Sequence, residues 1–245
     1  MNLLEVQGLR KTYPAFRLED VSFSVPEGAV MGLIGRNGAG KCTTLKSILG
    51  LVHPDAGRVE MFGREFSENE RYIKENIGVV LGGIDFYPKK KVRTITDVTR
   101  RFYSNWQEEK YRHYLDLFAI DENKRVDQLS SGMRVKYLLA LALSHNARLL
   151  ILDEPTSGLD PVSRDELAEL LRRIAADGTR SVLFSTHITS DLEKCASHIT
   201  FIQEGRLQRS DTLAGFMAHY ADLGSTLEEI IVAAERRPYD ADAII

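Results

Sequence analysis

The stretch Gly35-Arg36-Asn37-Gly38-Ala39-Gly40-Lys41-Cys42-Thr43 has the spacing of a phosphate-binding loop, in which a glycine and four further residues precede Gly-Lys. The glycines allow backbone N–H groups to curl around phosphate oxygens. A helix that begins at Lys41 would point its positive end at the same oxygens. The Lys41 ammonium would neutralise the outer phosphates. The stretch therefore predicts a nucleotide-binding site.

Cys42 stands where this motif normally carries a hydroxyl that ligates Mg²⁺. Magnesium selects oxygen over sulfur, so we expect Cys42 to hold the ion weakly or through a water, with the Thr43 hydroxyl nearby. A thiol at a helix N-terminus beside Lys41 should also favour the thiolate, which would make Cys42 a redox sensor. A tolerated substitution is the simpler interpretation, and the sequence favours it.

The composition is that of an ordinary globular protein. The chain has 245 residues, 43% of them hydrophobic, and its net charge of −3 predicts no binding of nucleic acid over the whole chain. Apolar runs such as Tyr137–Leu143 are too short to cross a bilayer. The N-terminus lacks a secretory pattern, and Cys42 and Cys195 are expected to be free thiols, which indicates a cytoplasmic location.

Buried strands alternate with helices, which predicts an α/β fold with a largely parallel sheet and the nucleotide at the carboxyl ends of its strands. An antiparallel edge, Leu3–Val6 and Val21–Val25, leads into the first buried strand. The expected strands of the sheet are Ala29–Ile34, Arg58–Phe62, Ile77–Leu81, Leu149–Leu152, Ser181–Ser185 and Ile199–Ile202.

Helical patterns divide the rest of the chain. Helices are expected at Lys41–Leu49 and, from its leucine spacing, at Pro161–Ala176. Between about residues 84 and 146 the segments Gln107–Phe118 and Met133–Ser144 also read as helices, without a strand between them. We expect a main domain at 1–210 that contains this helical insert, and a short helical extension at 211–245.

Two carboxylates follow the apolar run Leu149–Leu152. Asp153 is placed to hold Mg²⁺, directly or through water. Glu154 is placed to polarise the water that attacks the γ-phosphate of ATP. The pattern is weak alone, but together with the phosphate-binding loop it predicts a site that hydrolyses ATP.

With these two motifs the sequence resembles the ATP-binding cassette (ABC) family, from Leu3 to about Leu207. Three further motifs carry the resemblance: Leu129-Ser130-Ser131-Gly132-Met133, Ser157-Gly158-Leu159-Asp160 and Ser185-Thr186-His187. The resemblance implies a P-loop NTPase of the RecA-like type, with an antiparallel β subdomain and an inserted helical subdomain. It also implies ATP and Mg²⁺ as cofactors, and Lys41, Glu154 and His187 as the catalytic residues.

The family pattern also assigns roles to residues far from the loop. It implies a head-to-tail dimer in which Ser130 and the backbone of Gly132 complete the γ-phosphate site of the other subunit. His187 would contact the γ-phosphate, and Tyr13 matches the aromatic residue on which adenine stacks. The sequence itself places Ser130 where it can cap the helix that begins near Ser131.

The sequence departs from the family pattern in three ways. Besides Cys42, Gly82 replaces the glutamine that links magnesium to the membrane partner, and Ser131 with Met133 replace Gly and Gln of the signature, the motif Leu129–Met133. The first two departures affect the same ion, so we expect weaker Mg²⁺ binding and slow turnover.

The resemblance implies the ATP-hydrolysing subunit of a transporter, peripheral on the inner face of the membrane, which drives separately encoded transmembrane permease subunits. The run Lys89–Arg93 beside Phe86-Tyr87-Pro88 matches the region that grips a transmembrane subunit, and Phe102–Trp106 is similar to bacterial export cassettes. Two alternatives stay open, a regulatory subunit of low activity and a soluble ABC protein without a transport role.

Overall fold

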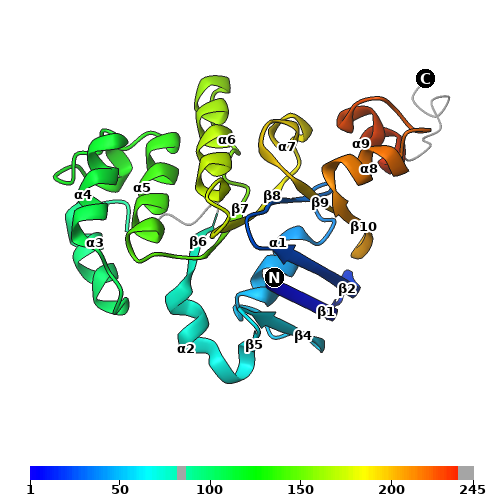
Figure 1. Cartoon of the computed structure of the whole chain (residues 1–245), viewed down its shortest axis with the longest axis horizontal. Helices are drawn as coiled ribbons and strands as arrows, with labels where there is room; N and C mark the ends of the chain where they lie inside the picture. The colour runs from blue at the N-terminus through cyan, green and yellow to red at the C-terminus, as the bar shows by residue number, and fades with distance from the viewer. Residues whose placement is uncertain (82–86, 237–245) are drawn as a thin grey trace.

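The computed structural model describes residues 1–81 and 87–236. Their strands form one ten-stranded sheet in the order β5-β4-β1-β2-β10-β9-β3-β8-β7-β6. From β9 to β6 every neighbouring pair is parallel, which confirms the predicted parallel sheet (Figure 1). The bounds of this parallel part are β3 (Val30–Ile34), β6 (Ile77–Leu81), β7 (Leu149–Asp153), β8 (Ser181–Thr186) and β9 (His198–Gln203).

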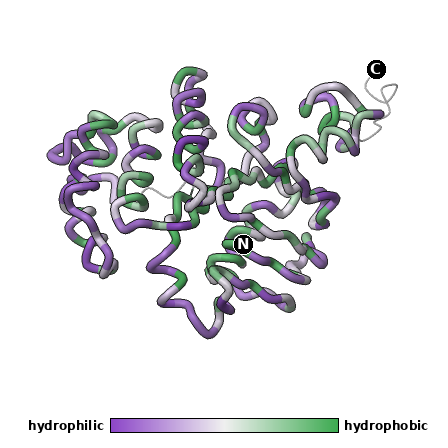
Figure 2. The backbone as a smooth tube through the Cα atoms, in the orientation of Figure 1, coloured by the Kyte–Doolittle hydropathy of each residue, from purple (hydrophilic) through white to green (hydrophobic). Residues whose placement is uncertain are grey.

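Both faces of the parallel strands are covered, as their near-continuous apolar sequences require. One face packs against α5 (Ser131–Ser144), α6 (Pro161–Ala175) and α7 (Thr189–Cys195), with the C-terminal helices beside them. The other face packs against α1 (Lys41–Ile48) and the N-terminal strands. Figure 2 shows hydrophobic residues along the central strands.

The antiparallel part of the sheet is larger than predicted. The two short runs expected near the N-terminus belong to long strands, β1 (Asn2–Tyr13) and β2 (Phe16–Pro26), which pair with β4 (Ala56–Met61) and β5 (Arg64–Glu65). Register shifts interrupt the pairing of β1 with β2 and break the strict alternation of apolar residues. Leu9 and Leu18 are nevertheless fully buried, so these strands extend beyond the expected runs.

Among the elements that were not predicted are α2 (Phe66–Asn76), α7 and β10 (Arg206–Thr212). The helix α2 is polar and buries only Ile73. The short helix α7 buries Leu192 and Cys195, and β10 has no fully buried residue. Each of these elements therefore lacks the apolar periodicity from which an element is predicted.

The region between β6 and β7 is helical, as the sequence indicates, and lies on the left in Figure 1. It contains α3 (Val92–Thr99), the 3₁₀ turns η1 (Arg100–Phe102) and η2 (Val126–Gln128), α4 (Glu108–Leu117) and α5. Its own small core includes Ile95, Tyr111 and Tyr137. The helix α5 lies close to β6, because a Cβ atom at Gly78 would come 2.4 Å from the Cβ of Ala142.

The C-terminal part continues the sheet before it becomes helical. Residues 211 and 212 still belong to β10, so the expected extension is helical only from α8 (Leu213–His219) and α9 (Leu227–Glu235) onward. These helices are anchored on the main core by Phe216, Leu227 and Ile230, which are fully buried. The division of the chain into domains stays a prediction.

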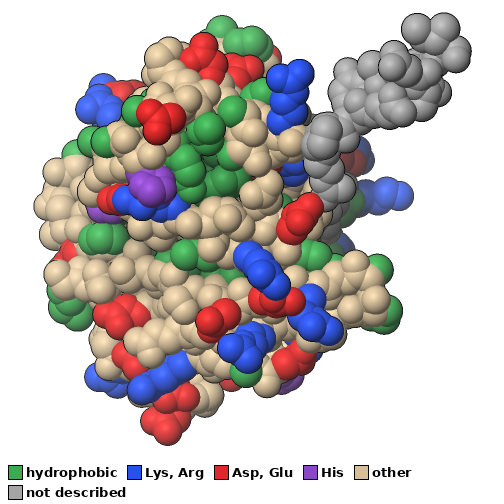
Figure 3. Space-filling model, turned by 90° about the vertical axis from the view of Figure 1, so that its right-hand side faces the viewer, with side chains coloured by type: hydrophobic (Ala, Val, Ile, Leu, Met, Phe, Trp, Pro, Cys, Tyr) green, Lys and Arg blue, Asp and Glu red, His purple; other side chains and the backbone are tan. Residues whose placement is uncertain are grey.

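On the face of the molecule seen in Figure 3, basic and acidic side chains are interspersed. Within residues 1–81 and 87–236, no helix combines the length and the apolar character that crossing a membrane requires.

Candidate nucleotide site

The predicted phosphate-binding loop connects the end of β3 to the start of α1. Gly38 and Gly40 have φ angles of 84° and 115°, which side chains with a Cβ rarely adopt. A Cβ at Gly40 would also lie 3.0 Å from the rings and methyls of Phe16 and Leu18. The loop is therefore closely packed against β2, and its glycines are needed for this path.

Lys41 lies inside the loop and is 5% exposed. Its Nζ donates to the carbonyl oxygens of Gly35 at 2.6 Å and Arg36 at 3.2 Å. The same Nζ lies 3.3 Å from Oε1 of Glu154, which follows β7. Lys41 thus connects the loop to the acidic end of β7, an arrangement that the sequence could only suggest.

Glu154 also contacts His187, which follows β8. The Nδ1 atom of His187 lies 2.8 Å from Oε2 of Glu154, and the histidine side chain is 41% exposed. Since Lys41 approaches the other carboxylate oxygen, Glu154 bridges both residues. The structure therefore brings the three proposed catalytic residues together at the carboxyl ends of three neighbouring parallel strands, β3, β8 and β7.

A cavity of about 520 Å³ opens beside the loop. Its volume lies within the range of small-molecule sites. The cavity is lined by Ala15, Phe16, Arg36, Asn37, Gly38, Gly40, Lys41, Cys42, Thr43, Asp153 and Glu154.

The aromatic residue in this cavity is Phe16, at the start of β2, which sequence reasoning missed. Tyr13, at the end of β1, is not among the lining residues, and the Lys11 ammonium lies 5.9 Å from its ring centroid. The adenine contact of Tyr13 stays a prediction. No motif includes Phe16, so the alternating pattern of the strands around the turn 13–16 was the only feature of the sequence that could have placed it at the site.

The environment of Cys42 contradicts the expectation of a favoured thiolate. Although Cys42 is exposed, partial desolvation of its thiol and the hydrogen bond with the Asp153 carboxylate raise the pKa of the thiol, and they outweigh the opposing effect of Lys46. The neutral thiol is therefore the favoured form, which speaks against the redox-sensor hypothesis. The second cysteine, Cys195, is free and buried, and its burial raises its pKa to about 12.

Asp153 is the last residue of β7 rather than the first residue after it, so the strand is one residue longer than predicted. Its carboxylate accepts a hydrogen bond from Ser185 Oγ at 2.6 Å, and Ser185 Oγ also accepts from the Glu154 N–H at 2.9 Å. Sequence reasoning used Ser185 only as part of a motif around His187 and did not assign it these contacts.

The side chains around Asp153 fit a Mg²⁺ site in which a bound nucleotide supplies some of the ligands. In the described part of the chain, no group of three or more His, Cys, Asp or Glu side chains could hold a metal ion. Asp153 nevertheless lines the cavity together with Cys42 and Thr43. One carboxylate with water and nucleotide phosphates is the usual environment of protein-bound Mg²⁺, so these residues fit an ion that arrives with a nucleotide.

The signature residues lie away from the cavity. Ser130 caps α5, as predicted, because its hydroxyl accepts from the Met133 N–H at 3.2 Å. Ser131 Oγ donates to the Gly158 carbonyl at 3.3 Å, and Gly132 faces Ser163 on α6. Neither Ser130 nor Gly132 lines the cavity beside Lys41 in the same chain. Gly82, the other altered position, lies outside the described residues.

A parallel sheet with a glycine-rich loop at its carboxyl edge, facing an Asp-Glu pair on a neighbouring strand, defines the P-loop nucleotide hydrolases. Within this class, the ABC transporter family model matches residues 18–157. The chain belongs to the ABC transporter family, as an ATP-binding and ATP-hydrolysing subunit.

Curated relatives support the assignment to the ABC transporter family. The bacitracin transport ATP-binding protein BcrA of Bacillus licheniformis is 32% identical over 84% of this chain and 68% of its own length. The Nod factor export ATP-binding protein I of Burkholderia orbicola is 39% identical over 76% of this chain and 62% of its own length. The matched region thus spans about two thirds of these relatives.

Solved structures have the same fold. The ATP-binding subunit of an ABC transporter superposes with a TM-score of 0.84 at 28% identity, over 96% of this chain and all of the other. A dimeric post-hydrolysis cassette bound to ADP and Pi superposes with a TM-score of 0.75 at 21% identity, over 86% of this chain and 98% of the other.

Proposed function

We propose that this chain binds MgATP and hydrolyses it to drive export through separately encoded membrane subunits. The observation that carries the proposal is the Glu154 carboxylate, which lies beside Lys41 and His187 at the edge of the cavity. Glu154 would orient the attacking water, Lys41 would neutralise phosphate charge, and Asp153 would hold the metal ion. Mg²⁺, when bound, supplies further neutralisation of the phosphates.

Export is the direction that the relatives support, since one is named for Nod factor export and another for bacitracin transport. We therefore place the chain at the inner face of the cell membrane, where it would pair head to tail with a second cassette. Ser130 and Gly132 would complete the partner's site, because they do not contribute to the cavity of their own chain.

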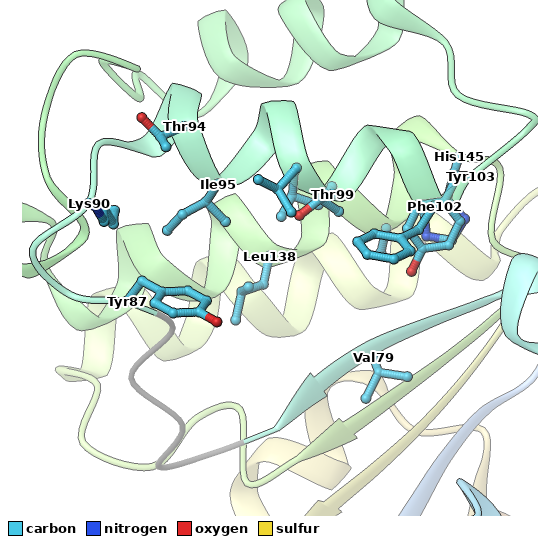
Figure 4. Close-up of a pocket in the computed structure, with 13 residues that line it drawn as sticks. Val79, Tyr87, Lys90, Thr94, Ile95, Thr99, Phe102, Tyr103, Leu138 and His145 are labelled. Carbon is cyan, nitrogen blue, oxygen red and sulfur yellow. The ribbon is translucent and has the colours of Figure 1, made fainter.

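A groove on the helical insert is our proposed contact with a membrane subunit (Figure 4). Its volume is about 610 Å³, and Tyr87, Ile95, Phe102 and Leu138 contribute to its largely apolar lining. Tyr87 and Phe102 are 69% and 73% exposed, an unusual state for large aromatic side chains. Lys90 lies at the same groove, where its charge would face anionic headgroups.

The test is the ATP turnover of the purified chain and of Glu154→Gln. We expect glutamine at this position to lower kcat by about a hundredfold or more, because it keeps the shape but removes the charge that polarises water. Glu166→Gln, which changes an exposed glutamate paired with Lys136 on α5, serves as the control. Equal turnover of the wild-type chain and Glu154→Gln would reject the proposed mechanism.

A further inference from the structure

Among the described hydrogen bonds, Ser185 is the only buried polar side chain that contacts both acidic residues of the site, Asp153 and Glu154. It is the register partner of Asp153 across β7 and β8, and it is fully buried. Its hydroxyl donates to Asp153 Oδ1 at 2.6 Å and accepts the backbone N–H of Glu154 at 2.9 Å. A serine hydroxyl has one proton and two lone pairs, so both contacts are satisfied at once.

The backbone at Glu154 requires such support. Its φ angle is 49°, in the left-handed region that residues with a side chain seldom adopt. Strain of this kind persists where the surroundings fix the conformation. The bond from the Glu154 N–H to Ser185 lies directly at this turn, and the turn directs the carboxylate toward Lys41 and His187.

The contact with Asp153 has a second consequence. Since Ser185 holds Oδ1, it keeps the carboxylate in one orientation beside the cavity that Asp153 lines. A carboxylate with a fixed orientation binds a small, geometrically demanding ion better than one that rotates.

We propose that Ser185 is a positioning residue for hydrolysis, whose hydroxyl orients the Asp153 carboxylate and the Glu154 backbone together. The inference rests on the proposed roles of these two acids. It predicts that loss of the hydroxyl affects the chemical step and the Mg²⁺ dependence, and leaves metal-free nucleotide binding unchanged.

The experiment compares Ser185→Ala with Ser181→Ala. Ser181 lies at the other end of β8, is also fully buried, and donates to the Pro26 carbonyl at 2.8 Å. We expect Ser185→Ala to lower kcat and the gain in ADP affinity on adding Mg²⁺ by roughly 10- to 100-fold, as for other residues that orient metal ligands. Ser185→Thr, which retains the hydroxyl, should restore both quantities.

The proposal is overturned if Ser185→Ala retains kcat and the Mg²⁺ effect on ADP binding, or if Ser181→Ala loses them equally. Failure of the proposed hydrolytic function is recognised separately, because wild type and Glu154→Gln would then show the same turnover. The ADP titrations need no turnover and decide the role of Ser185 toward Asp153 in either case.

A different contact joins the C-terminal helix to the phosphate-binding loop. Glu235, the last residue of α9, accepts the backbone N–H of Arg36 on Oε1 at 3.0 Å. Its side chain is only 9% exposed. The helix end is held in place by Gln203 Nε2, which donates to the Ala234 carbonyl at 3.1 Å.

The Gly35–Arg36 peptide therefore carries two contacts. Its carbonyl accepts from Lys41 Nζ at 2.6 Å, while its N–H donates to Glu235. In a trans peptide these two groups point in opposite directions, and hydrogen bonds on both strengthen each other. A nucleotide that draws Lys41 onto its phosphates removes one of the pair and so weakens the other.

The geometry points to Glu235 as a latch that favours the arrangement of the loop in which Lys41 contacts the carbonyls of Gly35 and Arg36. The carboxylate supports the state in which Lys41 is engaged by loop carbonyls, and its charge opposes that of incoming phosphates. Coupling between two sites is reciprocal, so nucleotide should also loosen α9.

The test is metal-free ADP binding to Glu235→Gln and to Glu228→Gln, which removes the same charge from the exposed first turn of α9. We expect a severalfold lower Kd for Glu235→Gln alone, within the usual range of such couplings. In the wild-type chain, ADP should increase hydrogen exchange of residues 227–235. Unchanged Kd and exchange, or an equal gain in Glu228→Gln, would overturn the latch.

Discussion

At the scale of single residues, Cys42 and Asp153 determine the metal site. A serine at position 42 would place an oxygen where sulfur now lies beside the Asp153 carboxylate. Thiols are poor ligands for Mg²⁺, whereas hydroxyls are among its ordinary ligands. Turnover in the natural chain is thus expected to be limited by a weakly held ion.

The corresponding prediction is that Cys42→Ser raises ATP turnover at limiting Mg²⁺. We expect the Mg²⁺ concentration for half-maximal rate to fall severalfold, since the serine hydroxyl supplies an oxygen ligand that the thiol does not. The measurement is a Mg²⁺ titration of the ATPase rate at fixed ATP. Cys42→Ala, which supplies no oxygen, is the control, and an unchanged or lower rate in Cys42→Ser would contradict the prediction.

At the scale of elements, the helix α5 ends at a buried histidine. His145 is 1% exposed, and its ring stacks on Tyr103 with a centroid distance of 3.7 Å. Burial lowers the pKa of His145 to about 4. Folding therefore favours the neutral ring. The contribution of His145 to the free energy of unfolding is fully present above the unfolded pKa near 6.5, and it is lost as the pH falls toward 4.

We expect the free energy of unfolding to fall between pH 6.5 and pH 4 by up to about 3 kcal/mol through this residue. His145→Phe keeps an aromatic ring on Tyr103 and removes the titration, so its stability should depend less on pH. Urea unfolding at several pH values measures the difference. His113→Gln, an exposed position on α4, should behave as wild type; an equal slope in His145→Phe would refute this assignment.

At the scale of the whole molecule, a single chain has a phosphate-binding loop and a signature that do not meet. We therefore expect Lys41→Ala and Gly132→Asp each to abolish ATP hydrolysis and an equimolar mixture to recover it. One site of a head-to-tail heterodimer combines both intact parts, which gives up to about a quarter of the wild-type rate for random pairing. A mixture as inactive as its components, both folded by thermal unfolding, would exclude head-to-tail completion.

The groove on the helical insert makes a second prediction at this scale. Phe102→Asp should prevent co-purification with a membrane subunit without affecting ATP binding, because aromatic anchors dominate interfaces of this kind. Leu117→Asp is the matched control, since Leu117 is 60% exposed on α4 of the same insert and does not line the groove. Equal recovery of the membrane subunit with both variants would place the contact elsewhere.

Local patterns were sufficient where one short segment carries both the element and its chemistry. The apolar run before Asp153 predicted β7 to within one residue, and the glycine spacing predicted the loop before α1. The elements α2 and β10 were missed, because polar segments on the surface bury too little to leave a period.

The sequence by itself determined the class of fold, the nucleotide chemistry and the family, since each depends on residues that are adjacent in the chain. Only the tertiary structure decided that Glu154 bridges Lys41 and His187, that Ser185 holds both acids, and that Glu235 reaches the loop. It also decided that the Cys42 thiol is kept neutral, because partial desolvation and the neighbouring Asp153 carboxylate depend on chain segments more than a hundred residues apart. Contacts across such separations follow from strand order and packing, which no local pattern encodes.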